Sequence, residues 1–262
     1  MSAPGLSGAG AILGAVEILA ASYFDNPEDG FGLQQVVLED VASGRRGPTA
    51  LTWNSSRYVA PTSREKRLPG FGRAASIAEE SGFPVLIRNS GGGAVAANEG
   101  SISFSLTFPV EDLRHGLYER YSEGMELISS ALRSLGVQAE AGEVEGEFCP
   151  GAYSIRSGGE RGVKHAGLAQ RVKKRAARLE ALILVSDTAA LIPLIERFYE
   201  ALGLPFQPES IADLDASVAQ IADMLSEEVH RRYTATEIQP DENILSRARL
   251  MRGAWKASSR SL

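Results

Sequence analysis

The chain has 262 residues, which suits one large domain or two small ones and is ample to bury a hydrophobic core. Apolar residues make up 44% and charged residues 23%, as in ordinary soluble globular proteins. The net charge of -6 argues against a general nucleic-acid binder, and the single cysteine excludes an internal disulfide and fits a reducing compartment.

The start of the chain is apolar-rich from Ala9 to Tyr23. It lacks a basic leading segment, Glu17 interrupts it, and it is too short to span a bilayer. We therefore interpret residues 1–28 as an N-terminal helix or a mobile start rather than a signal peptide. Because no later segment reaches membrane length, we expect a cytoplasmic protein without membrane contact.

The following residues alternate between helical and strand patterns up to a long helix. In chain order they predict a helix at 32–42, strands at 50–53 and 58–60, a helix at 74–80, and strands at 84–87 and 101–108. The longest helical pattern, at 109–135, comes next.

The second half predicts short strands at 137–139 and 153–156, a hairpin loop at 158–159, and strands at 164–173 and 179–186. Helices at 189–201 and 214–228 complete a globular domain at 29–230, and a basic C-terminal tail at 231–262 contains a helix at 242–255. Strands dominate the middle and helices the flanks, which indicates an α+β fold with a mixed or antiparallel central sheet flanked by helices.

Cys149 precedes Pro150-Gly151, a turn signal, and Lys164 follows fifteen residues later. A thiol at a turn that folding can bring close to a cation is a candidate nucleophile, whereas most lone cysteines are small buried hydrophobes. Four nearby glutamates would oppose thiolate formation if they lie close. They are Glu140, Glu143, Glu145 and Glu147.

A triple glycine, Gly91-Gly92-Gly93, follows a predicted buried strand, with Arg88 and Ser90 just before it. Such a run lets the backbone approach a ligand closely, and Arg88 could hold a carboxylate or phosphate. The alternative is a plain glycine-rich turn with a solvated arginine. The spacing matches neither of the common nucleotide-binding glycine motifs.

Positive charge is concentrated in two regions of this acidic chain. Residues 161–178 hold seven basic residues and no acid, and residues 231–262 hold seven against three, or 7 − 3 = +4. This distribution favours a positive face that docks an acidic partner protein, although a solvated strand edge would look the same. Three scattered histidines and one cysteine make a metal site improbable.

Together, three runs resemble the lipoate/biotin protein ligase and octanoyltransferase superfamily over about residues 30–230. The first is Arg88-Asn89-Ser90-Gly91-Gly92-Gly93-Ala94-Val95, the second is Gly162-Val163-Lys164-His165-Ala166-Gly167-Leu168-Ala169-Gln170-Arg171, and the third is Phe148-Cys149-Pro150-Gly151-Ala152-Tyr153. The third run is similar to the octanoyl-[GcvH]:protein N-octanoyltransferase branch, also termed lipoyl amidotransferases. The chain departs from the superfamily pattern at Ala97-Asn98, Ser103 and His165.

The resemblance implies a biotinyl/lipoyl protein ligase-like fold and an acyltransferase domain at 29–230. It implies transfer of an octanoyl or lipoyl group from a carrier such as the glycine cleavage H protein to a lysine of lipoyl-domain proteins, through a Cys149 thioester. It makes Cys149 and Lys164 the catalytic residues. The substrate-binding residues that it implies are Arg88, Ser90, Gly91, Gly92, Gly93, Gly167 and Ala169, and Leu106 is a guess for the acyl tunnel.

The implied partners are acidic lipoyl-domain proteins, namely the H protein and E2 subunits, and not nucleic acid. No cofactor is required on this interpretation, since the acyl group is the substrate. One alternative is an ATP-dependent lipoate or biotin ligase that uses ATP and Mg and in which Cys149 is incidental. Others are octanoyl transfer from acyl carrier protein and a non-catalytic homologue that binds lipoyl domains.

Overall fold

The computed structural model describes residues 15–21, 23–111 and 116–257. Its strands are β1 (Val16–Ala20), β2 (Thr49–Trp53), β3 (Tyr58–Ala60), β4 (Val95–Ala97), β5 (Ser101–Pro109), β6 (Glu140–Ala141), β7 (Ser154–Ser157), β8 (Val163–Lys173), β9 (Ala176–Leu184) and β10 (Ala235–Ile238). Its helices are α1 (Pro27–Ala42), α2 (Phe71–Glu80), α3 (Leu117–Ser134), α4 (Thr188–Leu202), α5 (Val218–Arg232) and α6 (Glu242–Arg249), with 3-10 turns η1 (Glu65–Arg67), η2 (Gly159–Arg161) and η3 (Pro208–Ser210).

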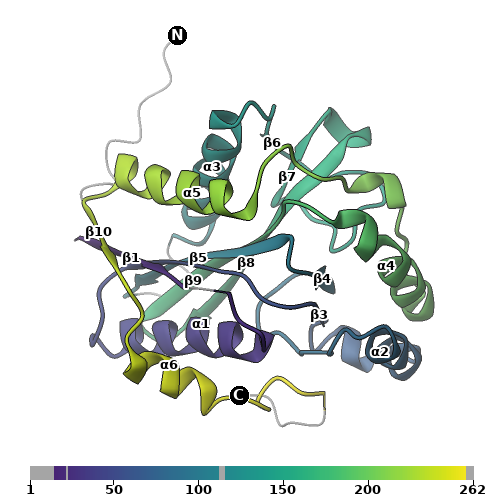
Figure 1. Cartoon of the computed structure of the whole chain (residues 1–262), viewed down its shortest axis with the longest axis horizontal. Coiled ribbons are helices and arrows are strands. Elements are labelled where there is room, and N and C mark those ends of the chain that lie inside the picture. Colours follow the sequence, from purple (N-terminus) through teal and green to yellow (C-terminus); the bar gives the residue numbers. More distant parts are fainter. Residues whose placement is uncertain (1–14, 22, 112–115, 258–262) are drawn as a thin grey trace.

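A mixed sheet forms the centre of the molecule, in the strand order β10-β1-β2-β5-β9-β8-β7-β6. β1 runs parallel to β10 and β2, and the other neighbours are antiparallel. Figure 1 shows α3 and α5 on one side of this sheet and α1 with α6 on the other. This arrangement confirms the predicted α+β fold with a mixed sheet flanked by helices.

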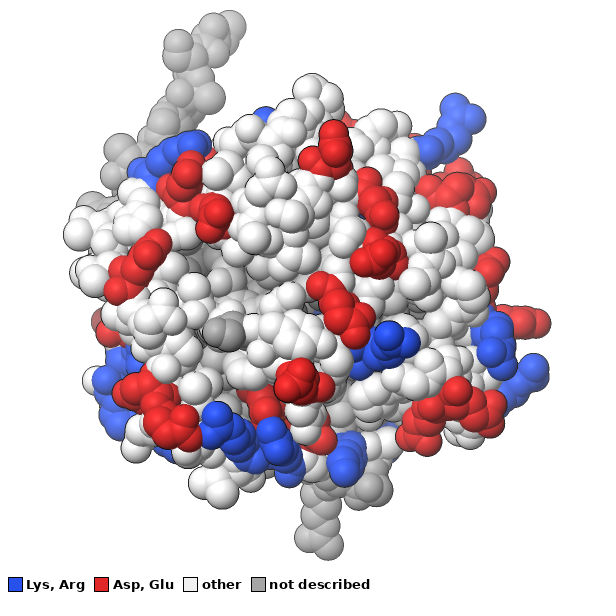
Figure 2. Space-filling view, viewed as in Figure 1, with Lys and Arg blue, Asp and Glu red and all other residues white. Residues whose placement is uncertain are grey.

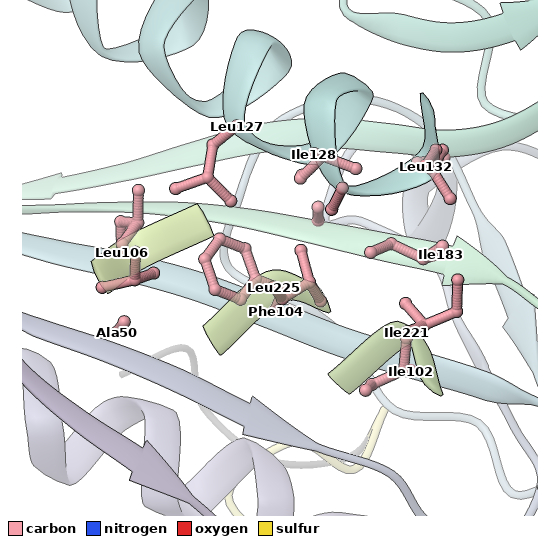
Figure 3. Close-up of a cluster of buried hydrophobic side chains, with 14 of the residues drawn as sticks. Ala50, Ile102, Phe104, Leu106, Leu127, Ile128, Leu132, Ile183, Ile221 and Leu225 are labelled. Carbon is pink, nitrogen blue, oxygen red and sulfur yellow. The ribbon is translucent and has the colours of Figure 1, made fainter. Parts of the chain in front are cut away.

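The main apolar core lies between the sheet and the pair α3 and α5. Figure 3 shows Phe104 and Leu106 of β5 beneath Leu127 and Ile128 of α3, with Leu225 of α5 beside them. All five side chains are at most 2% exposed. The burial of such apolar side chains is the dominant favourable contribution that holds helices on a sheet face.

The expectation for the start of the chain is wrong for residues 16–20. They form β1, which pairs with β2 and β10, rather than a helix or mobile start; residues 9–14 and 22 lie outside the described residues. The misleading signal is the short apolar run, which periodicity cannot distinguish from a helix segment. α1 begins earlier than predicted because Asn26 caps it and Pro27 suits its first position.

Several smaller differences have local causes. Residues 84–87 form isolated bridges, Val59 with Val85 and Leu86 with Lys256, instead of a strand. The predicted strand at 137–139 is absent, and β6 follows at 140–141. The predicted helix at 109–135 starts at Leu117, because Pro109 still pairs with Ala176 in the sheet; residues 112–115 lie outside the described ranges.

The basic tail packs on the body of the protein and is not purely helical. β10 joins the central sheet beside β1, and α6 lies against α1. Arg247 pairs with Asp40 and Arg252 pairs with Asp29, so two tail arginines are neutralised by acids of α1. Figure 2 shows Lys, Arg, Asp and Glu side chains mixed along the lower edge of this face, over α1 and α6. No helix in the described ranges has the length and apolar character needed to cross a bilayer.

Candidate active site

Cys149 lies in the loop between β6 and β7, where hydrogen bonds to its N–H and to its carbonyl hold its backbone. Its φ of 47° is in the left-handed region, which is rarely adopted by residues other than glycine. Its N–H donates to Oη of Tyr199 at 2.7 Å, and its carbonyl accepts from Nζ of Lys164 at 3.0 Å. Two buried side chains thus support a backbone conformation that is unfavourable by itself.

The glycine loop supplies the groups that contact the sulfur. The N–H of Gly93 donates to Sγ of Cys149 at 3.0 Å, and Nη2 of Arg88 lies 3.4 Å from the same atom. Arg88 also donates to the Gly93 carbonyl at 2.6 Å, which fixes the guanidinium against the loop. A backbone donor and a cation that both point at Sγ can stabilise negative charge on it.

The triple glycine is sterically required at Gly92 and fits tightly at Gly93. Gly92 has a φ of +89°, and a Cβ there would lie 2.9 Å from Sγ of Cys149. A Cβ on Gly93 would lie 3.3 Å from the Cys149 Cα, whereas a Cβ on Gly91 would meet nothing within 4 Å. Close approach of loop and thiol therefore explains Gly92 and Gly93, while Gly91 faces open space.

Lys164 is buried beside Cys149 and paired with a carboxylate. Its Nζ donates to Oε1 of Glu147 at 3.1 Å and to the Phe148 carbonyl at 2.9 Å, in addition to the Cys149 carbonyl. These three bonds occupy all three ammonium protons. A Cβ on Gly167 would lie 3.1 Å from Cε of Lys164, so this glycine leaves room for the lysine.

The four glutamates that precede Cys149 do not act as a group. Glu147 is fully buried and faces Lys164, while it also accepts from Oγ of Ser154 at 2.5 Å. Glu140 is exposed and pairs with Arg156, and Glu143 and Glu145 are exposed as well. The one buried member of these four glutamates is therefore paired with the predicted lysine.

Ser90 connects the glycine loop to a buried carboxylate, Glu180 of β9. Its hydroxyl donates to Oε1 of Glu180, and Nε of Arg178 donates to Oε2 at 2.7 Å. Burial alone would raise the pKa of Glu180, but Arg178, Ser90 and Arg88 outweigh it and lower the pKa. Ala169 pairs with Glu180 across the sheet and does not line the cavity described next.

A narrow cavity of about 50 Å³ lies against Cys149, Lys164, Arg88 and Gly167. Its floor follows one row across the sheet, in which Trp53, Ser103, Leu182 and Gly167 are successive partners on β2, β5, β9 and β8. With strands about 4.8 Å apart, this row spans about 14 Å. The remaining walls are largely apolar and aromatic. They include Phe31, Tyr58, Phe148, Leu168 and Leu184.

The cavity lining excludes Leu106, the residue proposed from the sequence for the acyl tunnel, and includes the phenol of Tyr58. Leu106 belongs to the core under α3 and α5, so it does not line the cavity. Burial raises the pKa of Tyr58 to about 12, which keeps this phenol neutral in the cavity wall. Together the walls suit an extended apolar chain that ends at a thiol.

Sequence reasoning missed Tyr199 and Glu65. The Tyr199 hydroxyl donates to the Ala94 carbonyl at 2.7 Å while accepting from Cys149, and burial raises its pKa well above the usual value. Glu65 accepts from the Ala94 N–H at 2.6 Å. Neither residue belongs to the three runs that carry the family resemblance. Only the fold brings α4 and η1 to the glycine loop. Within the described ranges, no three side chains of His, Cys, Asp or Glu gather as metal ligands would.

Two curated relatives are similar to this chain over about two thirds of its length. The chain is 34% identical over 183 residues to a protein of Bacillus velezensis and 32% identical over 171 residues to one of Geobacillus kaustophilus, both named octanoyl-[GcvH]:protein N-octanoyltransferase. The matches cover 68% and 65% of this chain but only 61% and 59% of those proteins, so the chain spans about three fifths of their length.

The fold is also that of a solved enzyme. A bi-partite lipoate protein ligase from Thermoplasma acidophilum superposes with a TM-score of 0.71 at 18% identity, over 95% of this chain and 98% of that one. The model of the lipoyl protein ligase A/B catalytic domain matches residues 26–239, which contain Cys149, Lys164 and the glycine loop. The chain therefore belongs to the lipoyl protein ligase A/B catalytic domain family.

Proposed function

We propose that this protein transfers an octanoyl or lipoyl group from a lysine of a GcvH-like carrier to a lysine of another lipoyl-domain protein, such as an E2 subunit. The observation that carries the proposal is the contact of Cys149 Sγ with the Gly93 N–H and Arg88 beside an apolar cavity. The names of the relatives at 32% and 34% identity support the same donor. The solitary thiol fits a reducing cytoplasm.

In the first half-reaction, Sγ of Cys149 attacks the acyl carbonyl of the donor amide. The S–C bond forms, the C–N bond breaks, and the donor lysine leaves as an amine that takes up the proton given up by the thiol. In the second half-reaction, the target lysine attacks the thioester, and the thiol regains its proton. One amide is exchanged for another, so the net reaction is near neutral in free energy and needs no ATP.

Lys164 is proposed to stabilise the oxyanion that develops on the acyl carbonyl. Since its three protons are bonded to Glu147, Phe148 and Cys149, it must exchange one carbonyl contact for the acyl oxygen. The Gly93 N–H is a second donor within reach of the same atom. Arg88, Ser90, Gly92 and Gly167 would bind substrate indirectly, by shaping the loop and the cavity.

The acyl chain would lie along the row from Gly167 to Trp53. A cavity of about 50 Å³ holds a few water-sized spheres, so the lining side chains must move apart when the chain binds. Ala169 and Gly91 lie off this path, and their roles would be limited to packing and to loop shape.

The test is to incubate the protein with octanoyl-GcvH in the absence of ATP and to measure intact mass. Wild type should gain one octanoyl group, and Cys149→Ala should gain none, a loss of about 10³-fold or more in acylation rate. Cys149→Ser, which keeps the side-chain size, should be similarly slow. Full activity of Cys149→Ser with ATP and free lipoate would instead establish a ligase and overturn the proposal.

A further inference from the structure

A second, open groove of about 470 Å³ lies on the outer side of the glycine loop. Its walls come from η1 and the residues just before it, the segment from Ile87 to Gly92, Arg171 of β8, and the segment after α6. We refer to it as the basic groove, because its lining contains five cations and neither aspartate nor glutamate. These cations are Arg64, Lys66, Arg88, Arg171 and Lys256.

Two cations of the basic groove, Arg64 and Lys66, have no acidic partner among the described residues. Both side chains are exposed. Arg171 donates to the Asn89 carbonyl, and burial together with the charge of Arg178 lowers its pKa although Glu180 opposes this shift. The tail arginines behave differently, since Arg247 and Arg252 pair with acids of α1.

Two acids lie close to the basic groove without lining it, and both are already bonded. Glu180 accepts from Ser90 and Arg178. Glu65 is 5% exposed, and its carboxylate accepts from the backbone N–H groups of Thr62 and Ala94. It does not line the groove. A positive groove on a chain of net charge -6 is a local feature that attracts an acidic ligand without making the whole protein a polyanion binder.

The basic groove leads to the thiol. Arg88 lines both the groove and the inner cavity, and its Nη2 lies 3.4 Å from Sγ of Cys149. Gly91 and Gly92, both exposed, form the edge between the two. A lysine that brings its acyl group to Sγ over this edge would place its neighbouring residues in the groove.

We propose that the basic groove docks an acidic segment next to the acyl-lysine of the carrier protein. The inference rests on the proposed function, since it assumes that the acyl group arrives on a protein lysine. Arg64 and Lys66 face the carboxylates of that segment, and this complementarity accelerates encounter and fixes the direction of entry. The docking surface is therefore not the basic tail or the whole 161–178 region, but a groove to which each contributes one residue, Lys256 and Arg171.

The test uses two octanoyl-lysine peptides that differ only in their flanks, one with Asp and Glu and the other with Asn and Gln. Wild type should be acylated from the acidic peptide with a kcat/KM roughly tenfold higher, and added NaCl should reduce this preference. Arg64→Glu and Lys66→Glu should each reduce the preference, and the double variant should abolish it. Arg197→Glu, an exposed arginine of α4 outside the groove, is the matched control and should keep it.

A small neutral donor, S-octanoyl-N-acetylcysteamine, separates docking from chemistry. It should acylate Cys149 equally fast in wild type and in the double variant. If no donor acylates wild type, the proposed function fails, while the affinity of the acyl-free acidic peptide, measured by fluorescence anisotropy, still tests the groove. Equal kcat/KM for the two peptides in wild type, or tighter binding of a DNA oligonucleotide than of the acidic peptide, would overturn the inference.

Discussion

The two faces of the central sheet differ in chemistry although both are buried, and β5 carries the contrast along one strand. Toward α3 and α5 it presents Ile102, Phe104, Leu106 and Phe108, all members of the main apolar core. The alternating positions hold Ser101, Ser103, Ser105 and Thr107, which are at most 6% exposed. Along β5, hydroxyls therefore replace hydrocarbon on the face that carries the cavity, and Ser103 lines the cavity itself.

This contrast teaches where stability and function are located. The apolar face is held by packing, in which loss of volume is costly. The opposite face also packs an apolar cluster against α1, but around the thiol it adds directed contacts, such as Lys164 with Glu147 and Tyr199 with Cys149. Substitutions on the apolar face should lower stability and spare the chemistry, whereas those at the site should change both.

The largest effect is expected for Lys164→Met. It leaves the Glu147 carboxylate fully buried without its cation, which should lower the free energy of unfolding by about 3–5 kcal/mol. Octanoyl transfer should also be lost, because the proposed oxyanion donor is gone. Urea unfolding and intact-mass acylation measure the two effects separately.

The double variant Glu147→Gln/Lys164→Met distinguishes the two roles of the lysine. Removing both charges should restore part of the stability, since no charge remains buried, although the single Gln oxygen can accept from only one of Ser154 and the Val144 N–H. Transfer should stay absent. Recovery of transfer in the double variant would show that Lys164 serves only to neutralise Glu147.

Phe104→Ala tests the apolar face. The ring is 2% exposed, and its loss should lower the free energy of unfolding by about 3–5 kcal/mol through the cavity that it leaves. The acylation rate per folded molecule should be unchanged.

Ser105→Ala is the control, because Ser105 is the next residue of β5 and lies on the face that carries the cavity. Its buried Oγ has no hydrogen-bond partner among the described residues, so its removal should cost close to nothing. A greater loss of stability in Ser105→Ala than in Phe104→Ala would contradict the comparison.

The residues that could be predicted from the sequence are those whose function depends on a local run. Cys149 before a Pro-Gly turn, the triple glycine and Lys164 are all recognisable without a fold, and the structure brings them within bonding distance. The apolar alternation of β5 is equally local. The family resemblance made the pairing of these runs predictable, since spacing alone did not select Lys164 over other lysines.

The remaining features depend on contacts between distant segments. Tyr199 lies 50 residues from Cys149 and Glu65 lies 29 residues from Ala94, and a buried tyrosine or glutamate leaves no local signal of its partner. β1 was mistaken because its partners, β2 and β10, lie far along the chain and only pairing distinguishes a short apolar strand from a helix. The ion pairs that attach the tail to α1 could not be read from charge counts for the same reason.

Tyr199→Phe gives the smallest effect and the finest test of the site. The variant keeps the ring but leaves the Cys149 N–H and the Ala94 carbonyl without their partner, which should lower stability by about 1–3 kcal/mol. Relaxation of the left-handed Cys149 backbone should also move Sγ away from the Gly93 N–H, and so slow alkylation by iodoacetamide. Tyr233→Phe, which removes a hydroxyl bonded to Glu123 at the end of α5, is the matched control. It should lower stability and leave the rate of alkylation unchanged.

If both variants slow alkylation equally, Tyr199 is only a core residue. If only Tyr199→Phe slows alkylation, α4 positions the thiol. The face that carries the cavity then depends on a helix outside the three runs that carry the family resemblance to hold Cys149 in place.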